Sequence, residues 1–118
     1  MEDFAVSVMP IAKLDEWRSF ADEIGSGDRA DAHREMLRRL GVKREHIRIT
    51  PTPNGHVMVL VWEGVDQSRI GDLMGQLLQD PQSDHERYVR DHVVPNLHGI
   101  DMSAGPPPAM ENVVTIET

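Results

Sequence analysis

The sequence contains no cysteine, and its 118 residues include only two Trp, one Tyr and two Phe. Without cysteine the chain forms neither disulfides nor thiolate metal sites and offers no Cys nucleophile, which fits a reducing compartment. It also lacks any apolar run near the roughly 20 residues that span a bilayer. Where a secretory signal would begin with basic residues, Glu2 and Asp3 follow Met1. We therefore expect a cytoplasmic protein.

Basic side chains are also in short supply, because 12 Lys and Arg face 20 Asp and Glu, for a formal net charge of -8. Nucleic acids and anionic membranes recruit basic residues, so we expect neither as a partner of this acidic protein. With 39% hydrophobic and 27% charged residues, the composition is that of a soluble globular protein. The length predicts one domain, residues 1–118, with one core.

The first forty residues predict a strand and two helices. Phe4, Val6 and Val8 share one face of residues 4–9, which is the alternation of a strand. From residue 13 the apolar residues recur at helical spacing as far as position 24, where the sequence Gly-Ser-Gly-Asp follows and favours a break. A second helical stretch follows and ends at Gly41, the expected C-cap.

The next segment predicts a hairpin with an unusual second strand. Residues 46–50 and 56–62 read as strands, and the intervening Pro-Thr-Pro-Asn-Gly supplies the turn. The second strand is apolar on both faces, with valines at positions 57, 59 and 61 on one and with Met58, Leu60 and Trp62 on the other. An antiparallel strand usually has one polar face, so both sides need a cover. Helices can cover one side, and a second protein chain is the simplest cover for the other.

The last third predicts two more helices and a terminal strand. Helical spacing returns over residues 70–78, and a further amphipathic helix runs from Ser83, the expected N-cap, to Pro95. Residues 103–109 contain three consecutive prolines and are expected to be an extended connector, because proline lacks the amide donor. Residues 110–117 contain Val113, Val114 and Ile116 and predict the terminal strand.

The resulting order of elements predicts an α+β fold of the ferredoxin-like β-α-β-β-α-β type, an antiparallel sheet with helices on one face. Four features resemble those of a known family: the order of elements, the strand that is apolar on both faces, the run Arg44-Glu45-His46-Ile47-Arg48 before the turn, and His98-Gly99-Ile100-Asp101 before the prolines. In these features the chain resembles a group of small uncharacterised proteins of the dimeric α/β-barrel superfamily. The resemblance implies a homodimer that pairs two sheets face to face around a shared interior.

The histidines of the last helix are the first candidates for chemistry. His85, Tyr88 and His92 lie three and four residues apart and share one helical face. His98 and Asp101 follow, but no His-Glu-x-x-His or similar ligand motif is present. We expect no metal and no cofactor. The alternative role of His85 and His92 is as partly buried side chains bonded to a backbone or carboxylate partner, with His98 at the helix end.

Arg48 is the sharpest candidate for ligand binding. It faces the same way as His46 and Thr50, and a guanidinium in a partly closed barrel suits a carboxylate or another anion. The alternative is an ion pair with an acidic residue across the subunit boundary, since Arg is common at interfaces. Trp62 ends the apolar strand and could stand at a cavity rim, and His56 begins the same strand.

Two functions follow from the resemblance and these residues. The first is a dimeric α/β-barrel protein that binds a small organic or anionic ligand in the barrel. The second is a cofactor-independent monooxygenase-like or isomerase-like enzyme that uses the same cavity, because enzymes of the wider superfamily have polar and aromatic pockets. The paucity of aromatic residues speaks against an oxygenase. The candidate ligand-binding residues for either function are Arg48, His56, Trp62, His85, Tyr88 and His92.

Overall fold

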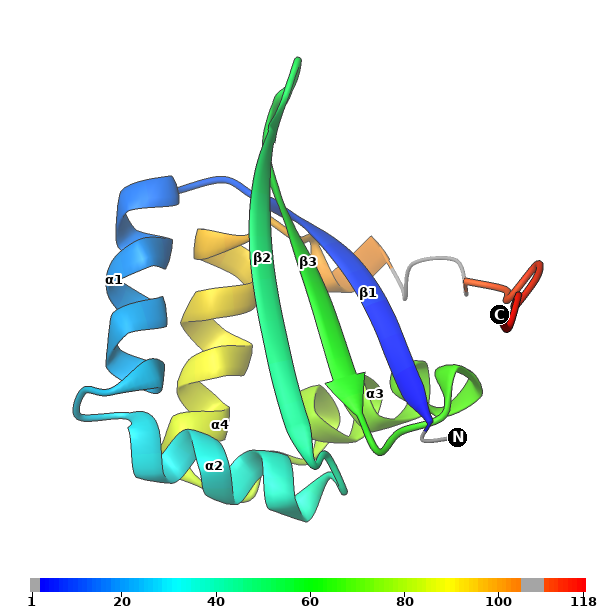
Figure 1. Ribbon diagram of the computed structural model, residues 1–118. Coiled ribbons are helices and arrows are strands. Elements are labelled where there is room, and N and C mark those ends of the chain that lie inside the picture. Colours follow the sequence, from blue (N-terminus) through cyan, green and yellow to red (C-terminus); the bar gives the residue numbers. More distant parts are fainter. Residues whose placement is uncertain (1–2, 105–109) are drawn as a thin grey trace.

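The structure, a computed structural model, describes residues 3–104 and 110–118, so most of the predicted proline-rich connector lies outside the described residues. The elements follow the predicted order as far as the last helix (Figure 1). They are β1 (Phe4–Ile11), α1 (Leu14–Gly25), α2 (Ala30–Arg39), β2 (Arg44–Thr52), β3 (Gly55–Glu63), α3 (Ile70–Gln79), α4 (Asp84–Tyr88), the π-helical segment η2 (Val89–Leu97), and the short 3-10 turns η1 (Gln67–Arg69) and η3 (Met102–Ala104).

The described strands form one antiparallel sheet in the order β1-β3-β2. The predicted hairpin is confirmed, and its register pairs Thr52 with Gly55 and Ile47 with Leu60. β1 lies on the other side of β3, with Val6 opposite Val61. The left-handed backbone of Gly41, at φ 81, ends α2 and turns the chain into β2, as predicted for a C-cap glycine.

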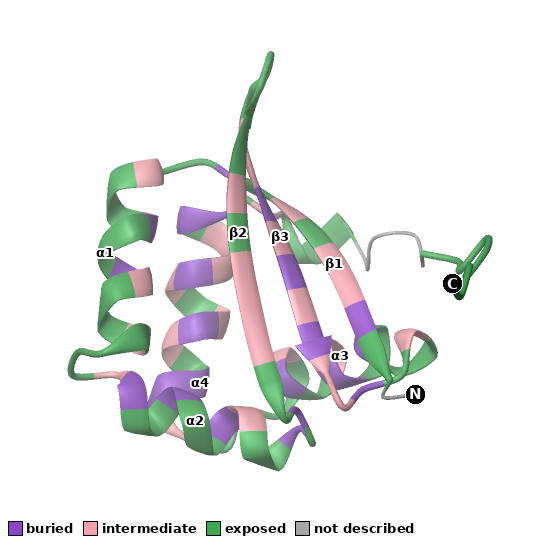
Figure 2. Ribbon diagram, viewed as in Figure 1, coloured by how far each residue is buried: buried purple, intermediate pink, exposed green. Residues whose placement is uncertain are grey.

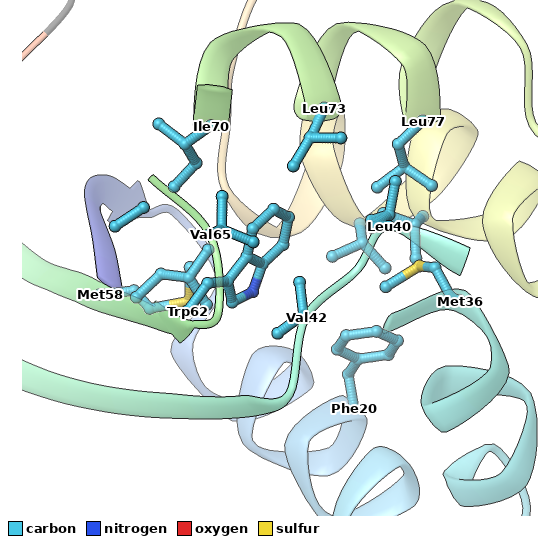
Figure 3. Packing of buried hydrophobic residues seen from close by; sticks show 14 of the residues in the cluster. Phe20, Met36, Leu40, Val42, Met58, Trp62, Val65, Ile70, Leu73 and Leu77 are labelled. Carbon is cyan, nitrogen blue, oxygen red and sulfur yellow. The ribbon is translucent and has the colours of Figure 1, made fainter. Parts of the chain in front are cut away.

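All helices that pack on the sheet cover the same face, where Met58, Leu60 and Trp62 of β3 are buried (Figure 2). Figure 3 shows Trp62 in one hydrophobic core with side chains from α1, α2 and α3, among them Phe20, Met36 and Leu73. The predicted α+β class, with helices on one face, is therefore confirmed.

The opposite face of the sheet carries no covering element in the described part of the chain. The valines of β3 at positions 57, 59 and 61 are partly buried there by their neighbours. On the adjoining edge strand, Phe4 is 58% and Val8 is 47% exposed. Monomeric proteins rarely leave such an apolar stripe in water, so this face needs an explanation.

The predicted terminal strand is not formed in the described residues. Residues 110–118 have no regular structure, and Val113 is 82% exposed. Val113 and Val114 are neighbours and would point to opposite sides of a strand, so an edge position would bury only part of the apolar side chains. The described residues thus form an α+β fold with one sheet of three strands and helices on one side, and the four-stranded ferredoxin-like topology is not confirmed.

The last predicted helix is confirmed, with a change of geometry inside it. Ser83 is the N-cap, and its hydroxyl accepts a hydrogen bond from the Glu86 amide at 3.1 Å. From Val89 to Leu97 the helix widens to the π form, with Pro95 inside it. Proline cannot donate an amide hydrogen bond, which is a common cause of such irregularity. The helix therefore ends two residues later than its proline suggested.

Candidate functional site

A chain of buried hydrogen bonds crosses the helix side of the molecule. The indole Nε1–H of Trp62 on β3 donates to Glu45 Oε2 on β2 at 2.7 Å. Glu45 Oε1 lies 2.8 Å from His33 Nε2 on α2, and His33 Nδ1 lies 2.9 Å from His85 Nε2 on α4. Four side chains from four elements thus form a single relay, Trp62–Glu45–His33–His85. Such a network is stable in a core only when its members satisfy one another.

The protonation of this relay follows from burial. Desolvation, helped by the neighbouring His33, lowers the pKa of His85 from 6.5 to about 4, so His85 is neutral at pH 7. A neutral His85 that donates from Nε2 makes His33 accept at Nδ1 and donate from Nε2 to Glu45. His85 Nδ1 then carries a free electron pair. It is buried, and no group in the described residues bonds to it.

Packing holds the outer end of the relay in place. The ring of Phe20 on α1 stacks on His85, with ring centroids 6.2 Å apart and planes 11° from parallel. The His85 ring meets His33 edge to face. Next to His85, the buried carboxylate of Glu86 forms an ion pair with Arg39 of α2, which ties α4 to α2. The imidazoles therefore have little freedom to turn.

The two middle members of the relay, Glu45 and His33, border a cleft of about 740 Å³ between α1, α2 and β2. The side chains of His33 and Glu45 are each 10% exposed and form part of its lining. Apolar walls include Trp17, Leu37 and Ile47. The charged lining is mainly basic and consists of Arg18, Arg34, Arg38, Lys43 and Arg44, with Asp22 as the other acidic residue.

The uncovered sheet face carries a second group of polar residues, along β2. His46 Nε2 lies 2.5 Å from Glu63 Oε2, and this hydrogen bond is the main cause that lowers the pKa of the Glu63 carboxyl. Arg48, two residues along, is exposed and pairs in register with Val59. Its guanidinium makes no ion pair within the described residues. The Arg48 cation thus lies beside the valines of β3 on the uncovered face.

The structure does not bring the six predicted site residues together within one chain. Arg48 lies on the uncovered face, whereas Trp62 lies on the helix face and is 2% exposed, so it stands at no cavity rim. His56 is partly buried at the hairpin end of β3 and faces the helix side. His85 points into the relay.

Tyr88 and His92 form a separate pair on the surface of the last helix. Their ring centroids lie 5.0 Å apart, and both line a small depression beside Phe20. The Arg29 guanidinium stacks over the Tyr88 ring at 3.7 Å from its centroid. The Asn96 side-chain amide lies 3.2 Å from His92 Nδ1. The described contacts of this pair are thus with each other, with the Arg29 guanidinium and with the Asn96 amide.

His98 and Asp101 also remain apart from the other candidates. His98 is buried, and its Nδ1 bonds to the Pro10 carbonyl at 2.8 Å, which fastens the helix end to β1. Burial lowers the pKa of its imidazole. Asp101 accepts hydrogen bonds from Ser103. In the described residues no group of three or more potential ligand side chains is placed to hold a metal ion.

Two members of the relay, His33 and Glu45, were missed as candidates from the sequence. In the sequence His33 recurs with Ala30, Leu37 and Leu40 at helical spacing, and a histidine on such an apolar face is more often a packed side chain than a functional one. Glu45 alternates with Ile47 and Ile49, so it belongs to the apolar, inward row of its strand. A carboxylate in that row must find a buried donor, and that signal could have identified it.

Comparison with protein-family models, with curated proteins and with solved structures found no match for this chain. The family resemblance stays a prediction from the sequence pattern. In the described ranges, no helix combines the length and the apolar composition that crossing a bilayer requires.

Proposed function

We propose that the chain acts as a homodimer that closes its uncovered sheet face against a second copy, as in dimeric α/β barrels, and binds a small organic or anionic ligand in the interior between the sheets. The observation that carries this proposal is the apolar stripe on that face. Exposed Phe4 and Val8 flank the partly buried valines of β3, and no described element packs on them.

A second copy is the occupant that the stripe fits best. A two-fold axis that lies between the faces and passes over the central strand, β3, places this strand opposite its counterpart, so valine packs on valine. An axis parallel to the strands also sets each β2, with Arg44 and Arg48, over the apolar β1 of the partner. This arrangement keeps the like charges of the two β2 strands apart.

Arg48 is the residue that supports a ligand in this interior. Beside the valines, between two sheets, its guanidinium would be partly desolvated and would favour a carboxylate or a comparable anion. The enzyme alternative has less support on this face. Of its proposed residues, Trp62 and His85 lie on the helix side, so neither lines a cavity between the two sheets.

The proposal is tested by light scattering coupled to size exclusion. The chain of 13.3 kDa should elute with twice that mass. Val59→Asp places a charge in the centre of the face and should give a folded monomer. Val113→Asp makes the same change at an exposed site outside the sheet and should leave the dimer intact. A wild-type monomer, or equal effects of both variants, would contradict the proposal.

Arg48→Met separates the two roles of that residue. If Arg48 binds the ligand, the variant stays dimeric and loses its affinity for inorganic phosphate in calorimetry. If the variant becomes monomeric while the affinity for phosphate is unchanged, Arg48 is an interface residue and the ligand hypothesis at this position is wrong.

A further inference from the structure

The cleft on the helix side concentrates positive charge in an acidic protein. Five of the 12 Lys and Arg residues of the chain line it, although the net charge is -8. The guanidinium of one of them, Arg44, pairs with Glu63 of the uncovered face, which leaves four cations for the cleft. Arg18 and Lys43 make no ion pair within the described residues. Arg34 and Arg38 are paired only with exposed carboxylates of their own helix, and such surface pairs are weak. These side chains can therefore turn to a bound anion.

The deep part of the cleft has a different chemistry. Glu45 and His33 reach it with a tenth of each side chain exposed, and their orientation is fixed from behind by Trp62 and His85. A carboxylate oxygen has two acceptor positions, so Glu45 retains capacity for another donor after its bonds to the indole and the imidazole. A negative group at this point repels a bare anion and favours a hydroxyl or an ammonium.

Between the basic rim and the acidic floor, the walls are apolar. Trp17 and Leu37 come from the two helices, and Ile47 and Ile49 from the inward row of β2. The volume, about 740 Å³, falls within the range of small-molecule sites, roughly 300–1,000 Å³. A ligand that satisfies all three zones has an anionic end, an apolar body and a hydrogen-bond donor at the far end.

We propose that this cleft is a binding site for a small organic carboxylate that carries a hydroxyl or ammonium group at its opposite end. Its carboxylate meets the basic rim, with Arg38 and Lys43 as principal contacts, and its donor meets Glu45. This site is separate from the proposed site between the two sheets, because it lies on the other face of the sheet and all of its residues belong to one chain.

The two tryptophans make the site directly observable. Trp17 lines the cleft, and the Trp62 indole donates to Glu45, so the two indole N–H resonances of the chain report on the wall and the floor. In a titration with para-hydroxybenzoate both resonances should shift and saturate. Benzoate lacks the donor and phenol lacks the anion, and each should bind about tenfold more weakly, the loss of one charge-assisted hydrogen bond.

A pair of matched double variants tests the rim. Arg34→Gln with Arg38→Gln removes two cations that line the cleft. Arg87→Gln with Arg90→Gln removes two cations from the last helix, which likewise pair with nearby carboxylates. The first pair should weaken para-hydroxybenzoate binding at least tenfold, and the second should leave it within about twofold. Since all four side chains lie at the surface or partly so, both proteins should fold.

Two further variants keep this site distinct from the sheet interior. Glu45→Gln removes the charge but keeps an acceptor, so it should reduce the preference for para-hydroxybenzoate over benzoate, and the monomeric Val59→Asp should retain binding. The proposal is overturned if para-hydroxybenzoate moves neither indole resonance, if both double variants weaken binding equally, or if Val59→Asp abolishes it. The last result would place the ligand between the sheets. A monomer has no interior between two sheets but keeps the cleft, so binding retained by the monomer supports the cleft as the site.

Discussion

Acid should destabilise this protein through one buried histidine. The His85 imidazole has a pKa of about 4 in the fold and 6.5 without its surroundings, so the unfolded chain takes up the proton first as the pH falls. The free energy of unfolding is then unaffected above pH 7 and declines between pH 6.5 and 4. At about 1.4 kcal/mol per pKa unit, the loss is roughly 2 kcal/mol at pH 5 and approaches about 3 kcal/mol at pH 4.

Other titratable groups also lower the free energy of unfolding as the pH falls, and they do so over pH ranges that can be distinguished. The lowered pKa of His98 adds to the decline below pH 6.5. The lowered pKa of Glu63 contributes stability that is lost only when the pH falls below its ordinary value of 4.5. Between pH 8 and 5, the decline therefore belongs to His85, with an addition from His98, the two histidines whose pKa burial lowers.

Urea denaturation followed by tryptophan fluorescence measures this decline, because Trp17 and Trp62 are buried in the fold. Protein concentration is held constant, since self-association would add to the apparent stability. His85→Gln should reduce the difference in unfolding free energy between pH 8 and pH 5 by about 2 kcal/mol. His92→Gln, in the partly exposed pair, is the matched control and should keep the wild-type difference. Equal wild-type stability at both pH values, or a full decline in His85→Gln, would show that protonation of His85 does not destabilise the fold.

Three smaller predictions concern stability at pH 7 and are measured by urea denaturation followed by circular dichroism. Trp62→Phe removes the indole donor from Glu45 and should cost about 1–3 kcal/mol, the penalty of a buried acceptor that loses its partner; a change below a few tenths would mean that water replaces the indole. Ser83→Ala removes the N-cap of α4 and should cost about 1 kcal/mol, whereas the exposed Ser68→Ala should be neutral. Gly41→Ala forces a side chain into left-handed backbone at φ 81 and should cost about 1–2 kcal/mol, unlike Gly71→Ala within α3, which should not destabilise.

The secondary structure was predictable because it is a property of short-range spacing. Alternation found the strands, helical periodicity found α1 to α4, and capping chemistry located Ser83 and Gly41 correctly. The prediction of a terminal strand was wrong for a related reason. Val113, Val114 and Ile116 have strand propensity, but a strand also needs a partner edge, and local pattern carries no information about that edge.

The candidate site was harder to predict, because it depends on register and on tertiary contacts. The hairpin pairs Thr52 with Gly55, so Arg48 lies opposite Val59 and Trp62 lies opposite Glu45. One residue of difference in the turn would have exchanged these faces. The sequence located the turn only as residues 51–55 and did not fix the register of the hairpin. Arg48 and Trp62 were therefore both proposed for one cavity, although they point to opposite sides of the sheet.

The relay illustrates the same limit. His33, Glu45 and His85 are separated by 12 and 52 residues along the chain, counted from His33, so no motif joins them. Only their placement on inward faces was visible in the sequence. Polar residues on inward faces of separate elements are the pattern to search for, because burial obliges them to find one another.

The association of two uncovered sheet faces can be measured by sedimentation equilibrium of the wild-type chain. We expect a mass of twice 13.3 kDa that persists on dilution to micromolar concentration and returns to 13.3 kDa in Val59→Asp. A wild-type chain that stays at 13.3 kDa at all concentrations would contradict this association.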